Sequence, residues 1–117
     1  MLTYEKFIGN YDIVVTIPTT IKWEDYEKEL IDAQQNNYVL NFKVNSFPKH
    51  TKKGNKCYLV HDNYMVGWLE IVGFEEKEFT CQTTGKKWKG KFILRSPKFN
   101  KIEPIYMKGF RGFKYLK

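Results

Sequence analysis

The fold class is decided by residues 57–72, which have the sequence CYLVHDNYMVGWLEIV. Two apolar runs flank the pair Asp62-Asn63, and both of these residues tolerate the left-handed backbone conformation of tight hairpin turns. The stretch therefore predicts a β-hairpin. Gly67 and Gly73 weaken a flat strand, and they predict a bulge or a sharp bend in the sheet.

The segments on either side of this hairpin predict further strands and one helix. Residues 11–17 are dense in β-branched residues and stop at Pro18, which predicts a first strand. From Trp23 to about Gln35 the apolar residues recur at helical spacing, and acidic residues crowd the first turns, where the helix dipole favours anions. The other predicted strands are 38–44, 79–83, 91–96 and 107–117.

About six short strands, with one helix after the first strand, indicate a mixed α+β, β-rich class that forms a small curled or closed β-barrel. The chain of 117 residues suits a single domain, 1–117. Its apolar runs are far shorter than the ~20 residues that cross a bilayer, so we expect no membrane segment. The first residues have no signal-peptide pattern, and we therefore expect a cytoplasmic protein.

Positive charge is concentrated toward the end of the chain. Residues 1–85 carry 9 basic and 12 acidic side chains, whereas residues 86–117 carry 11 basic side chains and a single acidic one, Glu103. Such asymmetry attracts phosphate backbones through counterion release. Nucleic acid is therefore the leading partner. The alternative is a lysine-rich surface that serves only solubility.

Two basic segments that contain aromatic residues are candidate binding sites. In residues 85–91, lysines flank Trp88, so that the lysines can neutralise phosphates while the indole stacks on a base. In residues 108–115, Arg111 lies between two glycines. In both segments the alternative is that the aromatic side chains fill the core. The predicted nucleic-acid-binding residues are Lys86, Lys87, Trp88, Lys89, Lys91, Arg95, Arg111 and Trp23.

The cysteines and histidines do not have the spacing of metal ligands. Structural zinc sites pair their ligands two to four residues apart, whereas Cys57 and Cys81 each stand alone in a predicted strand. A disulfide is not expected in a reducing compartment. The two cysteines are therefore expected to be small buried thiols, and we expect no metal and no cofactor.

The layout of the chain resembles the PUA-like superfamily, which includes PUA, ASCH and EVE domains. The resemblance lies in the helix after the first strand, the Trp68-Leu69-Glu70-Ile71 strand after a tight hairpin, and the terminal segment 109–115. It implies a pseudo-barrel of about six strands with a cleft for RNA or for an extruded, often modified, DNA base. The ASCH pattern G-x-K-x-x-E-x-R is matched at Gly85 and Lys87, but Gly90 and Phe92 stand at its last two positions.

These observations lead to three alternatives for function. The preferred prediction is a non-catalytic module that binds RNA or DNA, with or without reading a modified base. The second is a small ASCH-like hydrolase acting on a modified nucleoside or RNA, for which Lys22, Thr20 and Glu70 offer the residue types that the resemblance implies. The third is an interaction protein that binds an acidic protein partner through the same basic surface.

Overall fold

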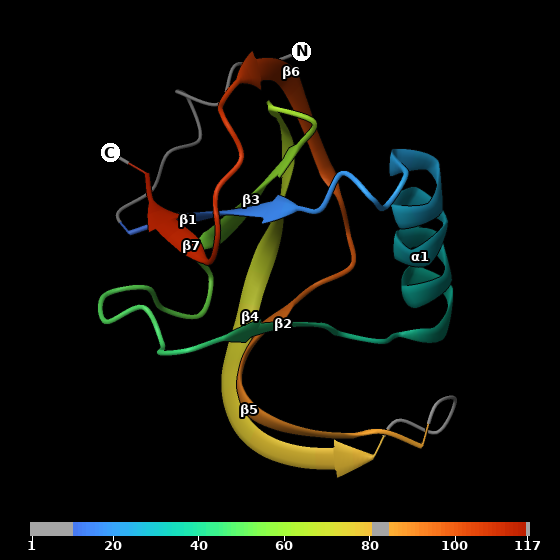
Figure 1. The fold of residues 1–117 in the computed structure, drawn as a ribbon, viewed down its shortest axis with the longest axis vertical. Helices are drawn as coiled ribbons and strands as arrows, with labels where there is room; N and C mark the ends of the chain where they lie inside the picture. The colour runs from blue at the N-terminus through green and yellow to red at the C-terminus, as the bar shows by residue number, and fades with distance from the viewer. Residues whose placement is uncertain (1–10, 81–84, 117) are drawn as a thin grey trace.

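The computed structural model describes residues 11–80 and 85–116, with the side chains of Phe79 and Trp88 outside that description. The elements in chain order are β1 (Ile13–Ile17), α1 (Trp23–Asn36), β2 (Leu40–Val44), β3 (Lys56–His61), β4 (Tyr64–Thr80), β5 (Lys87–Arg95), β6 (Asn100–Tyr106) and β7 (Phe113–Tyr115). The strands form one sheet in the order β2-β5-β4-β3-β1-β7, and β6 pairs with β4 (Figure 1). No helix in this part of the chain has the length and hydropathy needed to cross a membrane.

The long strand β4 organises the sheet. Its first part pairs with β3 across a tight turn, where Asp62 and Asn63 have the predicted left-handed φ angles of 51° and 63°. Its second part pairs with β5, and Figure 1 shows β4 bending between the two parts. Register shifts precede Gly67 and Gly73, so the irregularities predicted at these two glycines are confirmed.

The sheet is mixed and open. Strand β1 pairs in parallel with β3 and antiparallel with β7. The predicted β-rich α+β class, with one helix after the first strand, is confirmed. The curled or closed barrel of about six strands is not: the described chain forms seven strands, and β2 and β7 lie unpaired with each other at the two ends of the strand order.

The central strands β1 and β3 bury both of their faces. Ile13, Val15 and Ile17 pack in a core with Leu30 of α1, whereas Val14 belongs to a second core on the other face. The second core also contains Ile102 of β6. Burial on both faces explains why β1 is β-branched throughout and, apart from Thr16, apolar, without an alternation of apolar and polar residues.

Several predicted strands have different bounds from those observed. The strand predicted at 91–96 begins four residues earlier, as β5, so residues 87–90 lie in a strand and not in the loop that was expected before it. The segment predicted at 107–117 contains only the short β7, and β6 before it was not predicted. Pro104 lies inside β6 between the paired positions Lys101 and Ile105, where its missing N–H breaks no ladder hydrogen bond. The strand predicted at 79–83 is the end of β4 as far as Thr80, and its remaining residues lie outside the described part.

Candidate nucleic-acid interface and the adjoining pocket

The predicted lysines lie on a two-stranded projection of the sheet. Strand β2 pairs with β5 only between Lys91 and Arg95. The second part of β4, by contrast, pairs with the whole length of β5, from Arg95 to Lys87. Residues 87–90 and their partners on β4 therefore extend beyond β2 as a β4–β5 hairpin, at the lower end of the molecule in Figure 1.

One face of β5 carries most of the predicted basic residues. Successive side chains of a strand alternate between its two faces, so every second residue points the same way. The residues on this face are Lys87, Lys89, Lys91, Ile93 and Arg95. Ile93 is part of the core, so this is the inner face of the sheet. Lys87 and Lys89 continue it into solvent, where both are exposed.

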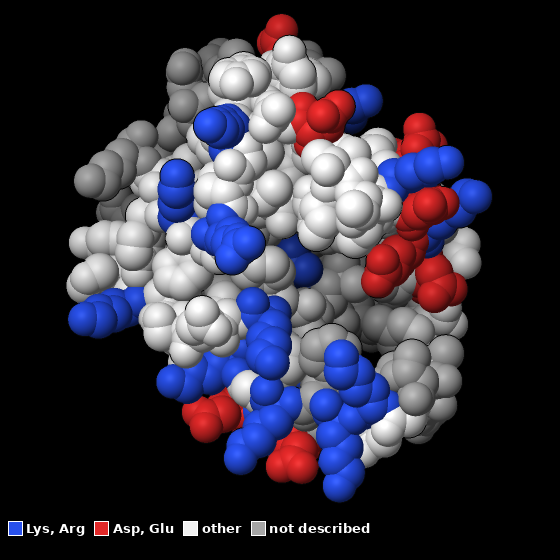
Figure 2. All heavy atoms as spheres, viewed as in Figure 1, with Lys and Arg blue, Asp and Glu red and all other residues white. Residues whose placement is uncertain are grey.

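Acidic residues of β4 lie beside these lysines. Glu76 pairs with Lys91 and Glu78 pairs with Lys89, which places each carboxylate on the same face as its lysine. Basic and acidic residues that are separated in the sequence are therefore partly interspersed on this face of the fold. Figure 2 nevertheless shows Lys and Arg side chains gathered over the lower part of this view, and acidic side chains gathered on the side of α1.

On the outer face of the hairpin, two other lysines make contacts between β2 and the hairpin. The Lys77 Nζ donates a hydrogen bond of 2.9 Å to Asn41 Oδ1 and lies 5.6 Å from the Phe92 ring centroid. The Lys43 side chain crosses Gly90, where a Cβ would lie 3.0 Å from the Lys43 Cε. These contacts tie β2 to the hairpin from the face opposite the row of lysines.

The remaining predicted surface residues are dispersed. Lys86 is exposed directly before β5, and the side chain of Trp88 lies outside the described part. Arg111 is exposed and lines a groove of about 380 Å³ with Lys43, between β2 and the segment that leads into β7. Strand β2 therefore lies between Arg111 and the hairpin.

Trp23 lies far from the hairpin lysines. It is the first residue of α1, whose 14 residues span about 21 Å, and the opposite end of the helix leads toward β2. The indole is half-buried, with its ring centroid 5.4 Å from that of Phe99 and 5.7 Å from that of Tyr26. These contacts make Trp23 a packing residue between α1 and the sheet.

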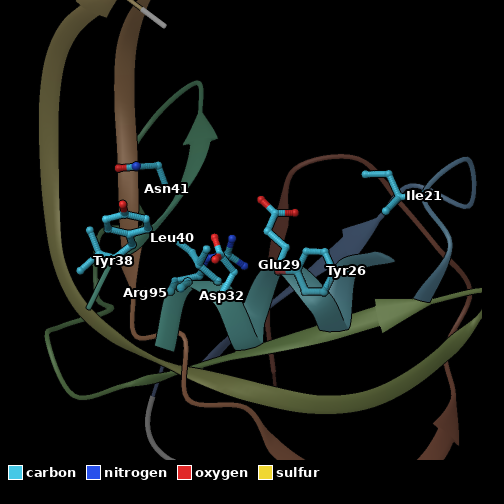
Figure 3. Close-up of a pocket in the computed structure, with 10 residues that line it drawn as sticks. Ile21, Tyr26, Glu29, Asp32, Tyr38, Leu40, Asn41 and Arg95 are labelled. Carbon is cyan, nitrogen blue, oxygen red and sulfur yellow. The ribbon is translucent and has the colours of Figure 1, made fainter. Parts of the chain in front are cut away.

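A pocket of about 540 Å³ opens where α1 faces β2 and β5 (Figure 3). Helix α1 contributes Tyr26, Glu29 and Asp32 to its wall, and β5 contributes Arg95. Tyr38, which precedes β2, also lines the pocket and is 59% exposed. The pocket therefore has an acidic wall, a basic wall and an aromatic side chain open to solvent.

Arg95 is buried in this wall rather than placed on the open surface. Its side chain is only 5% exposed, and its guanidinium carbon lies 5.4 Å from the Phe42 ring centroid. Its buried Nε has no hydrogen-bond partner in the described part of the chain. Unlike the hairpin lysines, Arg95 can contact only a group that enters the pocket.

The buried neighbours of Arg95 do not neutralise its charge. Burial raises the pKa of the Tyr26 phenol and of the Cys57 thiol, and the nearby Arg95 guanidinium offsets only part of each rise. Both groups are therefore protonated near neutral pH. Within residues 11–80 and 85–116, no carboxylate forms an ion pair with Arg95 at 4.0 Å or less.

We expect Cys57 to be unreactive in the folded domain. The thiolate is the reactive form, and Cys57 is fully buried with a raised pKa. The chain has two cysteines, so a Cys81→Ser variant isolates this thiol. DTNB at pH 8 should react with the variant only as fast as the domain unfolds, and should react fully in denaturant. Rapid reaction of the native variant would contradict the prediction.

The residues proposed for a hydrolase do not form a buried centre. Lys22, Thr20 and Glu70 are all exposed, the first two before α1 and the third on β4. A lysine that acts as a general base near neutral pH needs a desolvated position, which Lys22 does not have. The described residues also contain no cluster of three or more potential metal ligands.

The pocket is the feature that sequence reasoning missed. Tyr26, Glu29 and Asp32 recur at intervals of three on one face of α1, a signal that is visible in the sequence. Their partner Arg95 lies on a strand more than sixty residues away, which no local pattern indicates. No protein-family model, curated protein or solved structure matches the chain.

Proposed function

We propose that this domain binds single-stranded RNA or DNA along the inner face of the β4–β5 hairpin. The observation that carries the proposal is the row formed by Lys87, Lys89 and Lys91, which leads along β5 to the pocket wall at Arg95. Alternate residues of a strand are about 6.6 Å apart, close to the phosphate spacing of an extended single strand. Each lysine can therefore meet a successive phosphate.

The pocket favours a single strand over a duplex. Bases of a single strand can leave the stack at little cost and enter a cavity, whereas a paired base must first be extruded. The pocket volume of about 540 Å³ lies within the range of small-ligand sites. A strand whose phosphates follow the hairpin can thus insert one base between α1 and β5.

The proposal requires that the binding affinity depends on the salt concentration, although acidic residues lie beside the lysines. Glu76 and Glu78 lie beside the lysines and lower the net charge of the face. Binding then depends on a few phosphate contacts rather than on a strong general field. The observed affinity should therefore fall steadily as the salt concentration rises.

The resemblance to the PUA-like superfamily is compatible with this function but does not carry it. Domains of that superfamily are similar in having a helix after the first strand, and they accept RNA or an extruded base. The open seven-stranded sheet departs from the pseudo-barrel that the resemblance implies. Membership of that superfamily is a second part of the proposal, and it is supported only by the layout of the elements. The binding proposal itself depends on the lysine row and the pocket.

The double variant Lys87→Glu/Lys89→Glu tests the hairpin directly. Loss of two phosphate contacts should weaken binding of a fluorescent 12-nucleotide RNA or DNA by roughly tenfold or more at low salt. The slope of log affinity against log salt should decrease by about 1.4, which corresponds to two contacts on a single strand. Both side chains are exposed, but Lys89→Glu places a second carboxylate opposite Glu78, so stability should fall by no more than about 1 kcal/mol.

A variant with the same charge change elsewhere serves as the control. Lys101→Glu/Lys108→Glu alters two exposed lysines on β6 and in the following segment, away from the hairpin. This control should retain most of the affinity. An equal loss in both variants would assign binding to general charge, and absence of any binding at low ionic strength would refute the proposal.

A further inference from the structure

We propose that the pocket between α1 and β5 recognises an unpaired guanine base. The inference rests on the proposed nucleic-acid binding and adds the identity of the base that is read. It follows from the opposite hydrogen-bonding character of the two pocket walls. Arg95 provides donors on the β5 side, and the carboxylates of Glu29 and Asp32 provide acceptors on the α1 side (Figure 3).

The state of Arg95 indicates that the pocket takes a ligand with hydrogen-bond acceptors. The guanidinium carries its charge at all relevant pH values, although the side chain is almost completely removed from solvent. Its side chain interacts with the Tyr26 hydroxyl and the Cys57 thiol, which are both uncharged, and its buried Nε donor has no acceptor in the described part of the chain. A buried guanidinium with only uncharged partners and no carboxylate ion pair is poorly compensated, so an acceptor that reaches its remaining N–H groups from the pocket gains a strong charge-assisted hydrogen bond.

The acidic wall argues against a phosphate as the group that Arg95 meets. Glu29 and Asp32 line the same cavity, and they would repel a phosphate at close range. They can instead accept hydrogen bonds from N–H groups. The pocket therefore suits a group that presents acceptors on one edge and donors on another, which is a property of nucleobases.

Guanine is the base whose edges match this arrangement. Its O6 and N7 form an adjacent pair of acceptors, which an arginine fork binds in a bidentate manner. Its N1–H and 2-amino group are donors on the neighbouring edge, where Glu29 and Asp32 can accept them. Adenine presents an amino donor beside N7 instead of two acceptors. Cytosine and uracil carry their donors and acceptors along a single edge.

Aromatic and apolar side chains at the mouth complete a site for a flat ring. Tyr38 is 59% exposed, Val39 is 45% exposed and Ile21 is 39% exposed, although all three line the pocket. A base that stacks on Tyr38 would cover this apolar surface. The adjoining row from Lys91 to Lys87 would then hold phosphates on one side of that nucleotide.

Oligonucleotides that differ at one base test the inference on the unmodified protein. Each probe is a 12-nucleotide oligo-dT strand in which one central position is G, A, C or T, and affinity is measured by fluorescence anisotropy at one low salt concentration. We expect the G probe to bind roughly tenfold more tightly than the others, as for a bidentate arginine–guanine contact. Replacement of G by 7-deazaguanine removes N7, and replacement by hypoxanthine removes the 2-amino group. Each should abolish most of the preference.

Protein variants assign the preference to the two walls. Asp32→Asn and Glu29→Gln alter exposed residues of the acidic wall, and Arg95→Lys removes the fork. All three should lower the ratio of the affinity for the G probe to the affinity for plain oligo-dT, and this ratio is measured for each variant so that a general change in binding is divided out. Glu27→Gln, an exposed residue of α1 outside the pocket, is the matched control and should keep the full preference.

The outcomes separate this inference from the proposed function. Equal affinity for all four probes, or a preference that survives the base analogues, would overturn guanine recognition and leave hairpin binding intact. A preference that Asp32→Asn and Glu29→Gln leave unchanged would also overturn it. Absence of binding to every probe at low salt would overturn both proposals. Because the analogue series uses the wild-type domain, the test holds even if Arg95→Lys does not fold.

Discussion

A Gly67→Ala variant is expected to lose about 3 kcal/mol of unfolding free energy. A Cβ at this position would collide with the Phe99 ring at Cζ and would lie 2.5 Å from the backbone oxygen of Asn100. Overpacking of a well-packed site costs about 1–3 kcal/mol and occasionally more, and here one of the two obstacles is backbone that cannot rotate away. The absence of a side chain at Gly67 is what lets Phe99 lie against β4.

The effect should reach α1, because Phe99 is also a contact of Trp23, at 5.4 Å between ring centroids. Urea unfolding followed by circular dichroism measures the loss, and the midpoint of thermal unfolding should fall by roughly 10 °C. Gly73→Ala is the matched control, since its Cβ would meet only Leu94 Cδ1 at an ordinary 3.6 Å. Equal stability of the two variants would contradict the steric explanation. In a Phe99→Ala background the ring clash is absent, so the Gly67→Ala substitution should cost less there.

An Asp12→Ala variant is expected to lose about 2–4 kcal/mol of unfolding free energy. Asp12 precedes β1 and is 1% exposed. Its Oδ1 accepts hydrogen bonds of 2.9 Å from Asn55 Nδ2 and from the backbone N–H of Lys56. Removal of the carboxylate leaves both donors without this acceptor, at about 1–3 kcal/mol for each group that stays buried and unsatisfied.

Two further measurements distinguish this mechanism from a general packing loss. Asp12→Asn keeps an oxygen acceptor and should lose less stability than Asp12→Ala. Amide hydrogen exchange at Lys56 should accelerate in Asp12→Ala, because the backbone N–H of that residue loses its acceptor. Wild-type stability of Asp12→Ala, or unchanged exchange at Lys56, would show that the carboxylate does not hold the segment before β3 in place.

The helix and the central hairpin were predicted closely because their signals are local. The helix predicted from Trp23 to about Gln35 is observed as Trp23–Asn36, and it ends with Asn37 in the left-handed conformation. The hairpin turn falls at the two residues with turn chemistry. Helical periodicity and positive-φ residues act within a few positions of the chain, so the sequence reveals them directly.

The sheet beyond this hairpin was predicted less well because its signals depend on pairing partners. Three glutamates between residues 75 and 78 interrupt the apolar pattern of β4, so one long strand was predicted as two. Strand β6 was not predicted because it contains Pro104, and proline is unfavourable inside a hydrogen-bonded sheet. In the structure Pro104 lies between Lys101 and Ile105, which are positions that pair with β4. Open or closed topology depends on contacts between distant segments, which short-range patterns do not encode.

The candidate site shows the same division. The sequence identified the lysines of β5, and their alternation predicts a shared face once the strand is known. It did not separate exposed Lys87 and Lys89 from buried Arg95 on that face. The difference arises because α1 packs over the Arg95 end of β5, whereas the Lys87 end extends past β2.

By itself, the sequence determined the β-rich class, the helix after the first strand, the central turn and the concentration of positive charge in the last third of the chain. Each of these depends on composition or on neighbours a few residues apart. Only the tertiary structure decided that the sheet stays open, that Trp23 packs on Phe99, and that Arg95 lines the same pocket as two carboxylates of α1. Burial and pocket geometry depend on which distant segments meet, and the free energy of those contacts belongs to the whole fold rather than to any one segment.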